Sequence, residues 1–285
     1  MESSAEPFRD EAGVPRFALS AVLFLDLLGT AAVRDSAAML DRLTRTKRAV
    51  EQARKLTPTD ENGHGLWNAT WFSDNLGLYY AVSGPVFDSQ AVGFLVTDVG
   101  WLQLSFLSES LVARGGIAFG EFYADPNFIH GPALNRAVEL EKHLAIFPRV
   151  VLDDAALTVV RASLTGEYFS GLHAPWRRQL LADDKGAVFV DYLATLNDYD
   201  AQEPTEWLGE LTHHRDFIVR SVHQASTNEH VLAKYLWLAA YHNDFLHRYE
   251  WFLGDLVDEL TVEQVDAAAR FLPYGHDIEP PPDDE

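Results

Sequence analysis

The fold is decided by residues 17–29, which read FALSAVLFLDLLG. Residues 17–25, in which only Ser20 is polar, have the length and composition expected for a buried strand, which ends at Asp26. A carboxylate at the end of such a strand is costly to desolvate unless another group pairs with it. Taken alone, Asp26 fits a helix N-cap or an ion-pair partner; taken with a second carboxylate, it fits a functional site.

The segments that follow predict an α+β fold, in which helices cover one sheet. Two short apolar runs separated by Ser73-Asp74-Asn75 are typical of a β-hairpin. Pro132 is expected in the first turn of a helix, where its missing N–H costs nothing. The expected helices are residues 34–56, 87–112 and 131–145, and the expected strands are residues 67–72, 76–82, 111–119 and 147–152. The strand over 111–119 is expected to be interrupted at Gly115-Gly116.

From about residue 173 the chain becomes mainly helical. Residues 188–193 fit either a last strand or the start of a helix, and helices are expected over 205–225 and 229–254. The second of these is apolar almost all round, which is typical of a helix in the core or in an oligomer interface. The expected organisation is a flexible tail over 1–16, a main domain over 17–172, a helical extension over 173–272, and a disordered acidic tail over 273–285.

Composition excludes several classes of function. The 285 residues include 43 acidic and 22 basic side chains, which gives a formal net charge of −21. This balance argues against general nucleic-acid binding and against anionic membrane surfaces, since both need a surplus of Lys and Arg. The absence of Cys rules out disulfides, Cys-ligated metals and a Cys nucleophile. The acidic N-terminus is unlike a signal peptide, so a cytoplasmic location is expected.

Asp74 is the second carboxylate, and it lies at the tip of the expected hairpin. Turns favour Asp for local hydrogen bonding, so Asp74 alone fits a turn former. Together, a strand-end Asp26 and a hairpin-tip Asp74 can hold two hard cations through shared oxygens. Such a pair of ions can clamp a triphosphate and activate an attacking oxygen.

Five short motifs carry a resemblance to a known family. They are FLDLLG at 24–29, FSD at 72–74, RGGIAFG at 114–120, GPALN at 131–135 and ELE at 139–141. Their order and spacing over about residues 20–155 resemble the catalytic domain of class III nucleotide cyclases. With PRVV at 148–151 and KYLWLA at 234–239, the chain is most similar to the pyrimidine nucleotide cyclases of the bacterial Pycsar anti-phage defence systems.

The resemblance implies a reaction and a set of ligands. The ribose 3′ hydroxyl would attack the α-phosphate, and pyrophosphate would leave. Asp26, Asp74 and the backbone carbonyl of Leu27 would bind two divalent cations, Mn²⁺ or Mg²⁺, and Asn135 would orient the ribose. The resemblance also implies a homodimer with the active site between two chains, and a cyclic product that acts on a separate effector.

Departures from the family pattern bear on the substrate. Thr70 stands where purine cyclases usually have a Lys, and Phe128 stands where they often have an Asp. Neither side chain can make the usual adenine contacts, so a pyrimidine triphosphate is expected. UTP is preferred. CTP stays open, because one Asn, Thr or Tyr could distinguish the two bases and the sequence does not identify that residue.

A further departure concerns the charge of the transition state. Glu139 stands where the purine cyclases have an Arg. Arg114 is the first candidate to replace it and Arg136 the second. A structural ion pair explains Arg114 equally well, and a solvated helix face explains Arg136 better than a catalytic role does. Lys234 could reach a phosphate or could snorkel at the surface.

Because Glu139 stands at the place of the purine-cyclase Arg, a non-catalytic nucleotide sensor is an alternative to a cyclase. A plain interaction protein, with Asp26 and Asp74 as cap and turn, is another.

Overall fold

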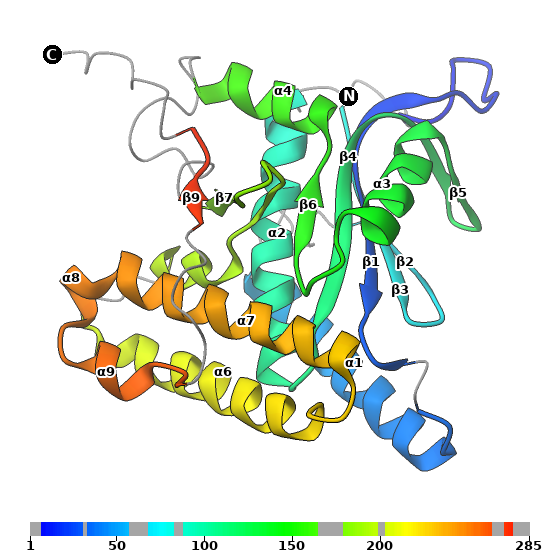
Figure 1. The fold of residues 1–285 in the computed structure, drawn as a ribbon. Coiled ribbons are helices and arrows are strands. Elements are labelled where there is room, and N and C mark those ends of the chain that lie inside the picture. The colour runs from blue at the N-terminus through cyan, green and yellow to red at the C-terminus, as the bar shows by residue number, and fades with distance from the viewer. Residues whose placement is uncertain are drawn as a thin grey trace, which may run out of the picture.

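The computed structural model describes residues 7–30, 33–56, 68–82, 88–164, 179–198, 203–263 and 271–275. Within these residues it confirms the predicted α+β class: one mixed sheet carries helices on both faces and is followed by a mainly helical C-terminal part (Figure 1). The strand order is β2-β3-β1-β4-β6-β8-β7-β9, and β5 pairs with β4 outside this path. All pairings are antiparallel except that of β4 with β6.

The centre of the sheet is β1, Ala18–Leu27, which lies between β3, Asn75–Ala81, and β4, Ala113–Asp125. The strand β2, Asn68–Phe72, pairs with the outer side of β3 and completes the predicted hairpin. Helices α1, Ser36–Leu56, and α2, Asp88–Ser108, connect these strands in the order βαββαβ. This order and the antiparallel pairing β2-β3-β1-β4 give the ferredoxin-like arrangement.

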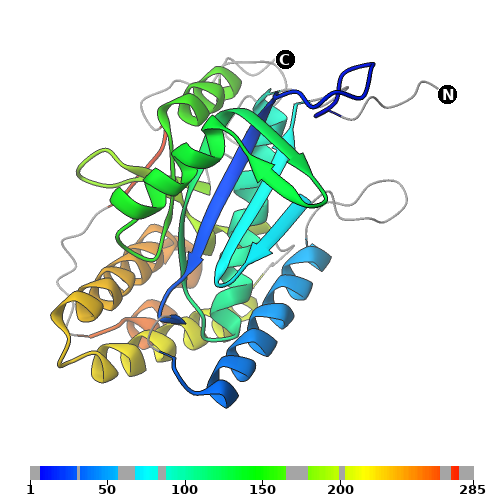
Figure 2. The same cartoon turned by 90° about the vertical axis from the view of Figure 1, so that its right-hand side faces the viewer.

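Helices cover both faces of β1, which explains why the strand is apolar on both sides. Leu23, Leu25 and Leu27 pack with α1 and α2 on one face. Phe24 packs on the other face with Ala137 of α3, Pro132–His143. Figure 2 shows α1 and α3 on opposite sides of the strands. Alternation along β1 therefore directs neighbouring side chains into two different cores.

Helix α2 is the central helix of the larger core. Its segment Gln90–Ser108 is long and apolar enough to cross a membrane, with a mean hydropathy of 1.3. However, 78% of that window is buried inside the protein. Such burial is typical of a core helix that is apolar all round.

The remaining strands extend the sheet across the predicted boundary at residue 172. They are β5, Phe128–His130, β6, Val150–Leu152, β7, Leu180–Ala182, β8, Val188–Val190, and β9, Leu272–Pro273. Residues 188–193, for which both a strand and a helix were possible, form β8 and the start of a 3₁₀ helix over Tyr192–Asp198. The C-terminal part thus shares a sheet with the main domain.

The predicted helical extension is confirmed, with one boundary corrected. Helix α6 is Thr205–Gln224, and α7 is Glu229–Arg248; the two lie side by side across one end of the strands (Figure 1). The expected helix over 229–254 breaks at Tyr249, and α8, Glu250–Leu253, and α9, Leu256–Leu260, follow. The break leaves Trp251 81% exposed, outside the core in which a continuous apolar helix would have placed it.

Other expectations were wrong or incomplete. Strand β4 runs without interruption through Gly115 and Gly116. The backbone of β1 approaches Gly115 closely and the backbone of α3 approaches Gly116, so the two glycines allow close packing rather than breaking the strand. The sequence did not predict β5 or α4, Asp154–Leu164. Residues 57–65, between the expected helix over 34–56 and the expected strand over 67–72, lie outside the described residues.

The two expected tails are partly packed where the structure describes them. Phe8 is buried against the rings of Tyr79 and Phe122, so residues 7–16 differ from a loose tail. At the other end, Pro273 lies in β9, and the buried Tyr274 hydroxyl accepts a hydrogen bond from Arg161. Phe8 and Tyr274 each supply an apolar contact, which the acidic composition of the tails did not predict.

Candidate functional site

Strand pairing brings Asp26, Leu27 and Asp74 to one edge of the sheet. The register of β1 with β3 puts Asp26 opposite Asn75, the residue after Asp74. The Leu27 N–H donates to the Asp74 carbonyl over 3.1 Å, which ties the strand end to the hairpin tip. The turn between β2 and β3 is tight, with Ser73 at a φ of 61°. The three residues named as metal ligands by the resemblance are therefore neighbours.

The turn after β1 is held by a side chain from α1. Thr30 Oγ1 donates to the Leu27 carbonyl over 3.0 Å and accepts from Arg42 Nε over 3.0 Å. The same guanidinium donates to the Leu28 carbonyl over 2.6 Å. Burial, followed by the charge of Arg45, lowers the pKa of Arg42, while Asp74 raises it. Arg42 thus fixes the backbone whose carbonyl is a candidate ligand.

Arg114 lies directly opposite Asp26 on β4 and is held by two carboxylates. Its Nε is 3.3 Å from Asp26 Oδ2, and its Nη2 is 2.5 Å from Glu141 Oε1. The side chains of Arg114 and Asp26 are each 22% exposed. Burial raises the pKa of Glu141 despite the opposing effect of Arg114, and Asp26 raises it further. Arg114 is therefore an ion-pair partner of the candidate metal ligand Asp26.

Lys234 brings a cation from the C-terminal helices to the same group. Burial and then Arg114 lower the pKa of Lys234, whereas Asp26 and Glu141 raise it. One turn later on α7, Trp237 stacks on Phe147 with ring centroids 5.5 Å apart, which fixes this end of the helix beside the sheet. Lys234 is thus electrostatically coupled to Asp26, Arg114 and Glu141.

The structure does not bring the other predicted site residues into this group. Asn135 is exposed on α3, and among the described residues no hydrogen bond or ion pair joins it to Asp26 or Asp74. Arg136 forms an exposed pair with Glu139 over 3.3 Å. Thr70 lies on β2 opposite Gly77, and Phe128 is 57% exposed on β5.

Sequence reasoning missed three contributors to the site: Glu141, Arg42 and Thr30. Glu141 lies in the ELE motif, but nothing in one sequence shows that it faces Arg114. Arg42 is one of six basic residues on α1, and only the packing of the helix selects it. Thr30 directly follows the motif at 24–29, so of the three residues its position near the site was the easiest to predict from the sequence.

The donors at this edge fit a hard divalent cation. Carboxylate oxygens of Asp26 and Asp74 and the carbonyl of Leu27 are the oxygen ligands that Mg²⁺ and Mn²⁺ take. No cluster of three or more His, Asp and Glu side chains suited to a metal occurs among the described residues. A cation here would therefore use the backbone carbonyl as well as the two carboxylates, in competition with Arg114.

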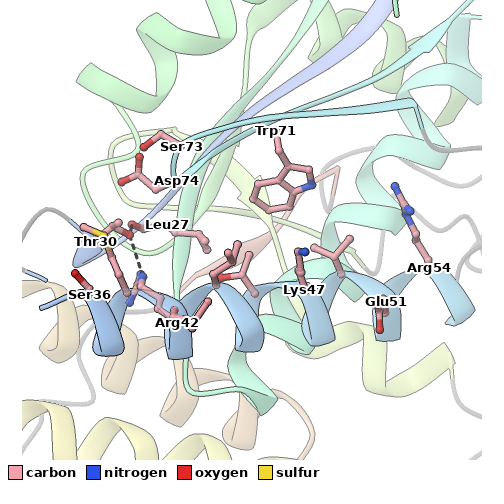
Figure 3. A pocket seen from close by; sticks show the side chains of 15 residues that line it. Leu27, Thr30, Ser36, Arg42, Lys47, Glu51, Arg54, Trp71, Ser73 and Asp74 are labelled. Carbon is pink, nitrogen blue, oxygen red and sulfur yellow. Dashed lines mark hydrogen bonds between the residues drawn. The ribbon is translucent and has the colours of Figure 1, made fainter.

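A cavity of about 800 Å³ lies beside this edge, between α1 and the β2–β3 hairpin (Figure 3). We name it the α1–hairpin cavity. Leu27, Thr30 and Asp74 line one end of it. Trp71 from β2 and Arg54 from α1 line it farther from Asp74. It adjoins the candidate site without containing the Asp26 side chain, which pairs with Arg114.

Comparisons with known proteins give a structural likeness only. One similar structure is the adenylyl cyclase CyaB from P. aeruginosa, with a TM-score of 0.44 and 11% identity over 61% of this chain and 94% of that one. Another is a class III adenylyl cyclase-like ATP-binding protein from Pseudomonas aeruginosa, with a TM-score of 0.37 and 11% identity over 90% of this chain and 74% of that one. No family model matches the chain, and a search of curated proteins finds no match. With both TM-scores below 0.5, neither likeness establishes a function.

Proposed function

We propose that the chain is a metal-dependent pyrimidine nucleotide cyclase of the class III type. It would convert UTP, or CTP, to the 3′,5′-cyclic monophosphate and pyrophosphate. The cyclic product would serve as a second messenger for a separate effector in anti-phage defence, and the working unit would be a homodimer in the cytoplasm. The motif resemblance supports the reaction class, and the pyrimidine preference rests on Thr70 and Phe128.

The observation that carries the proposal is the junction of β1 with the hairpin tip. The Leu27-to-Asp74 backbone hydrogen bond and the β1–β3 register bring together the backbones of two acidic residues, Asp26 and Asp74, that are 48 positions apart in the sequence. A structural turn needs only one of them. Two carboxylates and a carbonyl at one edge match the oxygen set of a divalent-ion site for phosphoryl transfer.

The residues at this site would have different roles in such a reaction. The bound cations would neutralise phosphate charge and polarise the attacking oxygen. Asp26, Asp74 and the Leu27 carbonyl would hold them, and Arg42 would fix the turn that presents that carbonyl. Arg114 and Lys234 would supply positive charge to the phosphates. Cyclisation needs in-line positioning and charge neutralisation more than a strong base, and this set provides both.

The test is to incubate the purified chain with Mn²⁺ and, separately, ATP, GTP, CTP and UTP, and to resolve the products by mass. A cyclic monophosphate from UTP or CTP is the expected result. Product from ATP or GTP would show that Thr70 and Phe128 do not select pyrimidines. Loss of product in Asp74→Asn, with product retained in Asp125→Asn at another turn, would tie the reaction to this site.

A non-catalytic nucleotide sensor is the second candidate, and the state of two arginines favours it. Arg114 is already paired with Asp26 and Glu141, and Arg136 is paired with Glu139 at the surface. A sensor would bind UTP or CTP saturably and release it unchanged. Calorimetric titration with nucleotide and Mn²⁺, followed by mass analysis of the same sample, separates the sensor from the cyclase.

A further inference from the structure

The α1–hairpin cavity has the size of a small-molecule site and lies apart from the Asp26 group. Pockets for small ligands commonly enclose about 300–1,000 Å³, and this cavity has about 800 Å³. Leu27 faces the core formed with α1, while its neighbour Asp26 faces Arg114 and Glu141 of the other side. The cavity and the Asp26 carboxylate are therefore on opposite faces of the sheet.

Apolar side chains line the cavity without being buried. Trp71 on β2 is 36% exposed, and Met39 and Leu43 on α1 are each 49% exposed. The next residue on β2, Phe72, turns to the other face of the sheet, where its ring lies 5.9 Å from that of Phe24. Trp71 thus presents an indole to the cavity. An aromatic ligand would gain by covering this surface, since burying apolar area is favourable.

The charge of the wall is positive in a strongly acidic protein. Helix α1 carries six basic and two acidic residues, although the chain has a net charge of −21. Lys47 and Arg54 point from α1 toward the hairpin, and the carboxylate of Glu51 points away from it (Figure 3). The lining as a whole has three basic residues, Arg42, Lys47 and Arg54, against the two acidic residues Glu51 and Asp74. An excess of one sign of charge raises the local concentration of ions of the opposite sign. The wall around Trp71 therefore favours an anion.

We propose that the α1–hairpin cavity binds a small aromatic anion. The aromatic ring lies against Trp71 and the exposed aliphatic side chains of α1, and the carboxylate, sulfonate or phosphate lies at Lys47. The site needs neither Asp26 nor a metal, although it shares Leu27 and Asp74 with the proposed cation site. Because Asp74 lines one end of the cavity, a bound anion would sit next to the hairpin tip.

The probe for this site is 8-anilinonaphthalene-1-sulfonate, and N-phenyl-1-naphthylamine is its uncharged counterpart. We expect saturable binding of one sulfonate per full-length chain by fluorescence and calorimetry. Lys47→Glu should weaken the sulfonate about tenfold, as expected for reversing a nearby charge, and should change the neutral amine less than about threefold. Trp71→Leu should weaken both probes.

Matched controls come from exposed positions elsewhere. Lys185→Glu, in the β7–β8 turn, and Trp251→Leu, on α8, should leave both affinities unchanged. Since Lys47 is exposed, Lys47→Glu tests the proposal even if Trp71→Leu is destabilised. Circular dichroism and urea midpoints verify that each variant is folded.

Three results would overturn the proposal. One is the absence of saturable binding to the wild-type chain. Another is equal affinity in the cavity variants and the controls, which would place the probe elsewhere. The third is a change from dimer to monomer in sedimentation velocity for the cavity variants with unchanged probe binding, which would assign the cavity wall to an interface between two copies of the chain.

Discussion

At the scale of single residues, Asp74 distinguishes a metal site from a turn. Its side chain accepts a hydrogen bond from Asn75 over 3.3 Å, which an Asn side-chain oxygen can also accept. Asp74→Asn should therefore leave the free energy of unfolding within about 0.5 kcal/mol of wild type. It should weaken Mn²⁺ binding at least about tenfold in calorimetry, because one carboxylate charge is lost. Asp125→Asn, in the β4–β5 turn, is the control, and equal Mn²⁺ affinity in both variants would remove Asp74 from the metal site.

Arg114 gives a second prediction at this scale, because it competes with a metal ion for Asp26. Arg114→Met should tighten Mn²⁺ binding several-fold, since a guanidinium 3.3 Å from the carboxylate is removed. If the cyclase proposal holds, turnover should fall at least about a hundredfold, because charge on the phosphates is no longer met. Arg136→Met should change neither quantity, since that side chain is exposed and paired only with Glu139 at the surface. Weaker Mn²⁺ binding in Arg114→Met would show that Arg114 organises Asp26 rather than competing for it.

Single residues were predictable where the backbone alone decides their position. Asp26 and Asp74 follow from a strand end and a hairpin tip, two places that local sequence marks well. Glu141 and Arg42 are on helices, and which helix face meets the site depends on how α3 and α1 pack. No local pattern contains that information. Only the structure shows that Glu141 pairs with Arg114 and that Arg42 holds the turn after Leu27.

At the scale of elements, Gly116 sets the distance between β4 and α3. A Cβ at this position would lie 2.5 Å from the Ala137 carbonyl oxygen and 2.5 Å from Leu140 Cβ. Gly116→Ala should therefore destabilise the fold by about 1–3 kcal/mol, because the helix must move away from the strand. Gly209→Ala, within α6 and with nothing within 4 Å, should stabilise by up to about 1 kcal/mol. Urea unfolding of the two variants measures both effects, and a neutral Gly116→Ala would contradict this packing.

Helices α6 and α7 are joined by a buried pair of histidines. His242 Nε2 lies 3.1 Å from the Leu260 carbonyl, which can only accept, so this nitrogen donates. With both rings neutral, His242 Nδ1 then accepts from His214 Nδ1 over 2.8 Å, and Tyr192 donates to His214 Nε2 over 2.9 Å. Burial lowers the pKa of both rings, that of His242 to about 4. The joint therefore requires neutral imidazoles.

This pair predicts a loss of stability in acid. Between pH 6.5 and about 4, His242 binds a proton in the unfolded chain but not in the folded one, so stability falls as the pH falls. The loss due to His242 should reach about 2 kcal/mol at pH 5, and His214 should add to it in the same direction. His242→Gln should be less stable than wild type at pH 7.5 but should lose less on acidification, while exposed His230→Gln should follow wild type. Parallel pH profiles of urea midpoints for His242→Gln and wild type would contradict the assignment.

At the scale of the whole molecule, the chain is less modular than its sequence suggests. The predicted domain boundary at residue 172 follows a change in composition, from alternating strands and helices to long helical patterns. The structure instead inserts β8 beside β6 and adds β7 and β9 beyond it. Pairings between strands distant in sequence leave no local signal, and strands of two or three residues are too short to show periodicity. The class of fold was predictable because β1, the hairpin and α1–α3 have strong local patterns.

A shared sheet and a shared core predict one unfolding transition. Tyr241 of α7 is fully buried, and its hydroxyl accepts from the Leu193 N–H and donates to Asp191. These contacts involve residues directly after β8, so separating α6 and α7 from the sheet would break the contacts at the end of an interior strand. Tryptophan fluorescence and far-ultraviolet circular dichroism should therefore give the same urea midpoint. Tyr241→Phe should shift both midpoints together, since it leaves the buried Asp191 carboxylate and the Leu193 N–H without the hydroxyl. Two separated midpoints, or a shift confined to the fluorescence, would mean that the helical extension unfolds as an independent unit, as the sequence alone suggests.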